Sequence, residues 1–284
     1  MIQHLLQLIW NQRKQNAWLW AELLLVSVFL WFLVDYLYVM GRTYTAPLGF
    51  DIRHTYSIVI SSLSERSPDY IPKEKRERPD GVHLLTALDR IRTYPGVESA
   101  CLTDGGMPYY MGSRNLVWRI DTLQVPCRYA FVTPEFFDVF RIYDKDGKTA
   151  SLKRAIEDNN SIVISADVET MNPGLSLLGQ KAYRGNVTDE IEETIRGISV
   201  PIRRHEYTKA EPNVYRALRL SRMEEGYYEG MIDAVRLCVR VRPDVDNADF
   251  PARFRKDMAE QLRLGNLYLL DVQPLSYIRN GYIR

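Results

Sequence analysis

The protein has 284 residues, of which 46% are hydrophobic and 26% are charged, a composition typical of a folded globular chain. Its 37 Lys and Arg residues nearly balance 36 Asp and Glu residues, and the two signs are interleaved along the sequence. Because no basic stripe stands out, the composition argues against a nucleic-acid partner.

Residues 1–16 begin the chain with the pattern of an amphipathic helix. Apolar side chains recur at positions i, i+3, i+4 and i+7, and Gln and His side chains lie opposite them. Such a helix would lie in the inner-leaflet interface of a membrane, either as a simple anchor or as a contact surface for a cytoplasmic partner. The candidate contact residues are Leu5, Leu6, Ile9, Trp10, Arg13 and Lys14.

Residues 17–40 contain a long apolar run, WLWAELLLVSVFLWFLVDYLYVM. A signal peptide fits poorly, because Tyr44 stands where cleavage before Pro47 would require a small residue. A buried globular helix is the stronger alternative, since the uncharged centre at 23–34 is short. The whole run would nevertheless extend about 35 Å as a helix, enough to cross a bilayer core of about 30 Å, and Trp and Tyr cluster at its ends. We therefore predict a transmembrane helix.

The charges in and around this helix predict its orientation. Arg13 and Lys14 precede the span and no acidic residue occurs before Glu22, so we expect a cytoplasmic N-terminus and an extracytoplasmic main domain. Glu22 and Asp35 lie on helix faces about 140° apart and cannot form one buried pair. Either both carboxylates reach the membrane interface, or each is an intramembrane polar contact to a different helix.

The segments nearest the two ends of the remaining chain predict two β-α-β-type units. The first has a strand at 56–61, a solvated loop at 64–81, a helix at 82–94 and a strand at 97–103. The second has a strand at 234–241, a helix at 249–266 and a strand at 267–272. The strict alternation of the strand at 234–241 predicts a half-buried strand, with Arg236, Arg240 and Arg242 on its polar face beside Cys238.

The middle of the chain is rich in short β-type runs. They lie at 115–121, 126–132, 161–166 and 195–202, separated by Gly, Pro, Asp and Asn. Short helices are expected at 133–140 and near Ser165.

Fragments that imitate catalytic or metal-binding motifs are incomplete. The DGKT turn at 146–149 has Ile142 where a phosphate-binding loop needs its first Gly, and His205-Glu206 has Lys209 where a zinc motif needs its second His. Three cysteines, an odd number without a C-x-x-C pair, favour buried free thiols over one disulfide with a spare thiol. We assign no catalytic, cofactor-binding or metal-binding residue and expect no enzymatic activity.

Five stretches in a fixed order carry a resemblance to a known family. They are YPGVESA, YAFVTPEFFDVFRI, NNSIVISADVETMNPGLSLLGQKAY, IRGISVPIRRHEYTKAEPNVYRAL and LCVRVRPDVDNADFPARFRKDMAEQL. The chain resembles the N-terminal half of the MacB/FtsX-like ABC transporter permeases, including their periplasmic core domain.

The resemblance implies an α+β fold in which the transmembrane helix precedes a two-lobed periplasmic domain. Residues 50–105 and 235–275 would form an α+β lobe, and residues 106–234 a β-rich inserted lobe. The chain would be a permease subunit that relays ATP-driven conformational change from a cytoplasmic ABC ATPase to the periplasm, for export or extracytoplasmic signalling. The other implied partners are a second permease in a homodimer or heterodimer, membrane lipid, and a periplasmic or outer-membrane protein.

The end of the chain differs from the family pattern. Family permeases have three further spans after the periplasmic domain, whereas this sequence stops at PLSYIRNGYIR, so we expect a fragment of a longer permease. Two other function classes stay open: a single-span anchored binding or sensing domain without an ATPase, and an anchored periplasmic hydrolase.

Overall fold

The computed structural model describes residue 10 and residues 17–110, 112, 114–185 and 190–283. The chain divides into two compact units, Met1–Ala46 with Glu206–Thr208, and Pro47–His205 with Lys209–Arg284. We describe each unit by itself.

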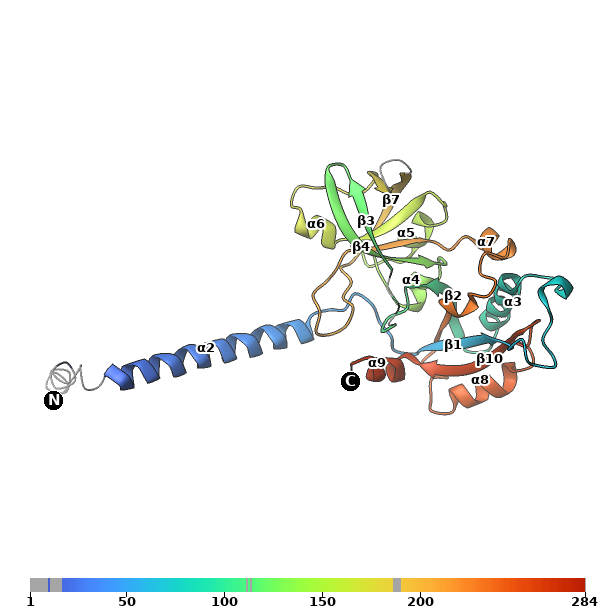
Figure 1. The fold of residues 1–284 in the computed structure, drawn as a ribbon, viewed down its shortest axis with the longest axis horizontal. Helices are drawn as coiled ribbons and strands as arrows, with labels where there is room; N and C mark the ends of the chain where they lie inside the picture. The colour runs from blue at the N-terminus through green and yellow to red at the C-terminus, as the bar shows by residue number, and fades with distance from the viewer. Residues whose placement is uncertain (1–9, 11–16, 111, 113, 186–189, 284) are drawn as a thin grey trace. The chain divides into compact units, whose positions relative to one another are not determined.

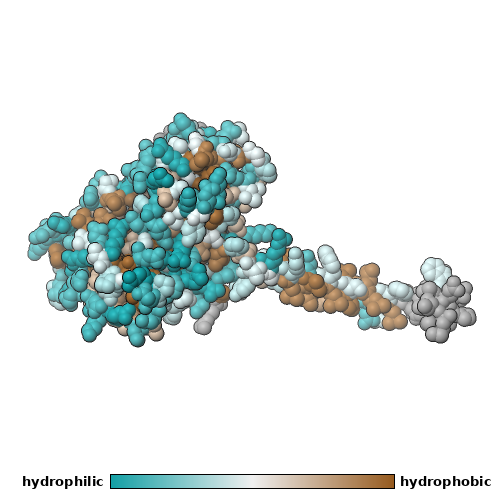
Figure 2. All heavy atoms as spheres, turned by 180° about the vertical axis from the view of Figure 1, so that it is seen from behind, coloured by the Kyte–Doolittle hydropathy of each residue, from teal (hydrophilic) through white to brown (hydrophobic). Residues whose placement is uncertain are grey.

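The first unit contains the long helix α2 (Ala17–Thr45). Its 29 residues include the whole expected span at 17–40, and none of them is buried. Figure 2 shows apolar side chains along most of its length. An apolar helix without buried residues is unlike the core helix of a soluble protein, which was the main alternative.

The described part of the second unit is built on one ten-stranded sheet, in the order β10-β1-β9-β2-β4-β3-β6-β7-β5-β8 (Figure 1). The strands are β1 (Thr55–Ser62), β2 (Val97–Asp104), β3 (Arg114–Ile120), β4 (Leu123–Val132), β5 (Ser161–Ser165), β6 (Lys181–Arg184), β7 (Ile191–Ser199), β8 (Asn213–Ala217), β9 (Val235–Val241) and β10 (Leu267–Pro274). The helices are α3 (Asp80–Arg92), α4 (Phe136–Val139), α5 (Ala150–Ala155), α6 (Asp167–Met171), α7 (Leu220–Glu224), α8 (Phe250–Met258) and α9 (Leu275–Ile283), with single 3₁₀ turns at Lys73–Lys75 and Ile232–Ala234.

The first four strands of this order form two interleaved β-α-β units. The unit β1-α3-β2 has β9 between its two strands, and the unit β9-α8-β10 has β1 between its two strands. Neighbouring strands are antiparallel throughout. This is the split β-α-β arrangement of ferredoxin-like folds.

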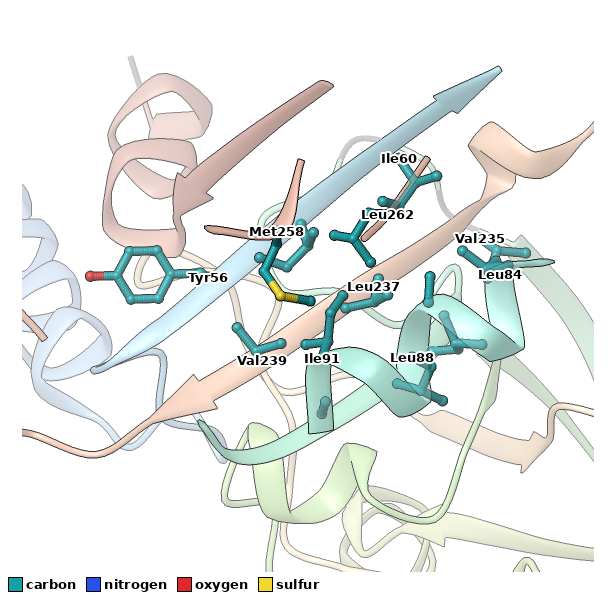
Figure 3. Packing of buried hydrophobic residues seen from close by; sticks show 14 of the residues in the cluster. Tyr56, Ile60, Leu84, Leu88, Ile91, Val235, Leu237, Val239, Met258 and Leu262 are labelled. Carbon is teal, nitrogen blue, oxygen red and sulfur yellow. The ribbon is translucent and has the colours of Figure 1, made fainter. Parts of the chain in front are cut away.

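Helices α3 and α8 share one hydrophobic core with these four strands. Leu84, Leu88 and Ile91 of α3 and Met258 of α8 pack against strand side chains such as Leu237 (Figure 3). An apolar stripe with a spacing of four residues is buried in this core, and its members are Phe250, Phe254, Met258 and Leu262. Helix α8 ends at Met258, earlier than expected, and Leu262 reaches the core from the turns that follow.

The loop expected at 64–81 is not wholly solvated. Helix α3 already begins at Asp80, directly after Pro79. Arg76 is mostly buried and donates hydrogen bonds to Asp80 at 3.1 Å and to Glu229 at 2.9 Å. The sequence did not predict this ion cluster, because many closely spaced charges of both signs are also typical of a solvated loop.

The other six strands close into a barrel. They pair in the order β4-β3-β6-β7-β5-β8, and β8 pairs with β4 in turn, in parallel. The interior is filled by side chains that include Trp118, Ile120, Val125, Ile164, Ile195 and Val214. Strands β3, β4, β5 and β7 match runs that the sequence predicted, whereas the short β6 and β8 were missed.

Strand β9 has no solvent face. Cys238 and Arg240, expected on the polar side of a half-buried strand, are fully buried, so that prediction was wrong. The second face of the sheet packs against α4, in a cluster that contains Cys101, Cys238, Phe136, Phe137, Phe140 and Tyr215. All three cysteines are buried and none forms a disulfide, the state that the sequence favoured.

An apolar N-terminal helix followed by a mixed, β-rich domain confirms the expected α+β class. The barrel strands come from residues 114–217, and the other four strands come from both sides of this stretch in the sequence. Residues 47–205 and 209–284 nevertheless form one compact unit, so the division into two lobes stays a prediction.

Candidate functional site: the apolar helix and the start of the domain

Helix α2 is the one described helix that is long and apolar enough to cross a membrane. It is continuous from Ala17 to Thr45, so Glu22 and Asp35 lie on faces about 140° apart, and both are exposed. Their intramembrane contacts stay a prediction. Trp10 is described and exposed, while the other candidate contact residues, Leu5, Leu6, Ile9, Arg13 and Lys14, lie outside the described residues.

The segment that starts the domain, residues 47–54, is fastened to the domain by its backbone. Asp51 N–H donates to the carbonyl of Phe140 at 2.8 Å, and Arg203 N–H donates to the carbonyl of Leu48 at 3.0 Å. Gly49 has a φ of +85°, and a Cβ there would lie 2.1 Å from the carbonyl oxygen of Pro201. Only glycine allows this close approach between the segment and the chain after β7.

Arg240 holds the same segment from inside the domain. Its Nε donates to the carbonyl of Val139 at 2.7 Å, its Nη1 to that of Arg53 at 2.7 Å, and its Nη2 to that of Asp51 at 2.6 Å. The side chain is fully buried. Burial lowers the pKa of Arg240 and nearby Arg141 adds to this, whereas the Asp51 carboxylate opposes it. One cation therefore joins β9, α4 and the start of the domain.

Asp51 supplies the negative charge at this junction. Its carboxylate accepts hydrogen bonds from Arg53 Nε at 3.1 Å and Nη2 at 2.9 Å. Burial alone would raise the pKa of Asp51, but the hydrogen bonds from Arg53 and the charge of Arg240 outweigh it and lower the pKa.

A second polar contact braces the start of β1 against the turn before α8. His54 Nδ1 lies 2.5 Å from Asp246 Oδ2, and the Tyr56 hydroxyl donates to the same carboxylate. Burial, and then the Asp246 carboxylate, raises the pKa of Tyr56, so the phenol keeps its proton. These three side chains include no activated nucleophile, and we assign them a bracing role. Nor do the described residues contain a cluster of His, Cys, Asp and Glu that could hold a metal ion.

The first and last described strands of the domain, β1 and β10, are neighbours in the sheet. Tyr56, at the start of β1, lies opposite Pro274, at the end of β10. Leu275, the next residue, is fully buried in the cluster under α4. A displacement of residues 47–54 and the start of β1 would therefore be passed to β10 through their paired backbones.

Sequence reasoning missed Arg240 because alternation alone cannot tell a solvent face from a second buried face. Cys238 on the same face was the available signal, because cysteine is among the most buried residue types.

Comparison with known proteins gives matches among solved structures alone: no family model and no curated protein matches the chain. A domain of a Porphyromonas gingivalis protein named as a permease matches with a TM-score of 0.52 and 19% identity, covering 82% of this chain and 98% of that one. The periplasmic region of MacB from Actinobacillus actinomycetemcomitans matches with a TM-score of 0.46 and 9% identity, covering 86% and 98%. The extracellular domain of the noncanonic ABC-type transporter YknZ from Gram-positive bacteria matches with a TM-score of 0.43 and 12% identity, covering 76% and 100%. The first of these matches shows that the domain of this chain has the fold of a domain from a protein named as a permease.

Proposed function

We propose that this chain is the N-terminal part of a MacB/FtsX-type ABC transporter permease. Helix α2 spans the inner membrane with its N-terminus in the cytoplasm, and the folded domain lies in the periplasm. A separate ATPase hydrolyses ATP, and this chain relays the resulting movement across the membrane. Two permease copies, identical or different, assemble around the path that the transported substrate or the signal takes across the membrane.

One observation carries this proposal: an apolar helix of 29 residues directly precedes a domain with the fold of a permease domain. The fastening of residues 47–54 supports a relay. Arg240 connects this segment to both β9 and α4. A movement of the segment would therefore be transmitted to the core of the domain and would not be absorbed by a flexible linker.

The amphipathic pattern at residues 1–16 supports a contact with the ATPase. We expect the affinity to come from its apolar positions, with Leu5 and Leu6 at their centre.

Affinity purification of the full chain in a mild, uncharged detergent tests the proposal. We expect it to recover a nucleotide-binding subunit, which labelling with an ATP analogue identifies. Leu5→Ser together with Leu6→Ser should abolish recovery, whereas the matched change of Gln3→Ser together with Gln7→Ser, on the opposite face, should preserve it. Recovery of no nucleotide-binding subunit by the unaltered chain in several detergents would contradict the proposal.

A further inference from the structure

A cavity of about 250 Å³ lies at one end of the barrel. Side chains of β3, β4, β6, β7 and β8 line it, together with residues of the segment that follows β8. Trp118, from the apolar filling of the barrel, and Tyr228 are buried aromatic residues among them. The volume is below the range of about 300–1,000 Å³ typical of drug-sized ligands, so it suits a small group.

Five arginines line this cavity and dominate its charge. They are Arg114, Arg184, Arg216, Arg219 and Arg222. The carboxylate of Asp104 pairs with Arg114 at 2.8 Å. The buried carboxylate of Glu193 pairs with Arg216 and lies 3.5 Å from Arg184.

Among the described residues, these two carboxylates leave an excess of positive charge at the cavity. Arg219 and Arg222 have no carboxylate partner among the described residues. Burial lowers the pKa of Arg216; Glu193 opposes this effect, and the positive charges of Arg184 and Arg219 add to it. The guanidinium groups of Arg184, Arg216 and Arg219 are therefore close enough to repel one another.

Aromatic rings hold several of these guanidinium groups in place. The Arg216 guanidinium lies 4.9 Å from the centre of the Phe131 ring, and that of Arg114 lies 5.8 Å from the same ring. The Arg222 guanidinium lies 5.2 Å from the Tyr227 ring. Stacking of this kind fixes the plane of the guanidinium and leaves its edge free to donate.

We propose that this cavity binds a phosphate group carried on a small organic molecule or on a lipid. The excess of positive charge fits a doubly charged anion better than a single carboxylate. Planar guanidinium groups match the oxygens of phosphate in bidentate geometry. The aromatic walls would contact the apolar part that bears the phosphate.

Binding measurements on the full chain in uncharged detergent micelles test this site. Phenyl phosphate offers the group on a soluble aromatic body, and a short-chain phosphatidic acid offers it on a lipid; calorimetric titration of each measures the affinity. We expect saturable binding of one molecule per chain by at least one probe, and the tighter probe identifies the source. Arg219→Gln together with Arg222→Gln should weaken this binding by about tenfold or more, since a hydrogen bond to a charged group is lost with each change.

A matched variant controls for general charge effects. Arg66→Gln together with Arg78→Gln removes the same charge from exposed positions outside the cavity and should change the affinity by no more than about twofold. Absence of saturable binding by both probes, or equal weakening by the two double variants, would overturn the proposal.

Discussion

Arg240 donates to three backbone carbonyls, two in the segment 47–54 and one in α4, and it does so from a fully buried position. Arg240→Met keeps much of the volume but removes all three donors. Since an unpaired buried acceptor costs about 1–3 kcal/mol, we expect the free energy of unfolding to fall by about 3 kcal/mol or more. Urea unfolding of the full chain measures the change.

Arg242 provides the control for this substitution. It lies two residues further along the chain, and its ion pair with Asp244 is solvent-exposed. Arg242→Met should therefore change the stability by less than about 1 kcal/mol. Equal urea midpoints for the two variants would refute the role assigned to Arg240.

Asp51 gives the junction a dependence on pH. Its folded-state pKa is lowered, so it lies below the unfolded value of about 3.9. The ionised carboxylate then stabilises the fold at pH values above the unfolded pKa, and this contribution is lost as the pH falls through the folded-state pKa. We expect Asp51→Asn to be less stable than the unaltered chain at pH 7, with the difference shrinking as the pH approaches 3.

Urea midpoints at pH 7, 5 and 3 measure this effect. Asp244→Asn, at an exposed position, should follow the unaltered chain at each pH. A constant difference between Asp51→Asn and the unaltered chain over this range would mean that the carboxylate charge plays no part.

At the scale of single elements, helix α2 and the domain have separate sources of stability. No residue of α2 is buried, and the three hydrophobic clusters contain only residues from Phe50 onward. We expect deletion of residues 1–46 to release a folded domain into the soluble fraction, because all of its core side chains remain. Fractionation and the thermal unfolding of the released domain measure this result, and a chain that stays with the membrane or fails to unfold cooperatively would contradict it.

Helices and strands with a regular spacing of apolar residues were predictable from the sequence, and those without such a spacing were not. The apolar stripe of α8 and the alternation of β9 gave the right element type, because their patterns extend over many residues. Strands β6 and β8 are four and five residues long, too short to show a period. Strand β8 also places Arg216 two residues after Val214, on the face that lines the barrel, where a sequence-based prediction expects an apolar side chain.

At the scale of the whole domain, the interleaved strand order was beyond a sequence-based prediction. Local patterns predicted both β-α-β units, but the placement of β9 between β1 and β2 depends on contacts between distant residues. The cavity at the barrel end was missed for the same reason. Its arginines are spread from Arg114 to Arg222, and only closure of β8 onto β4 brings them together.

The place of β1 between β9 and β10 also has a consequence for how the domain is synthesised and folds. β1 leaves the ribosome early, yet its two neighbours, β9 and β10, come last among the described strands of the domain. Such pairing between distant segments is slow, and until it forms, an apolar strand stays open to wrong partners. The sheet around β1 therefore cannot close until β10 has been made, so biogenesis of the domain should rely on chaperones that hold extended polypeptide.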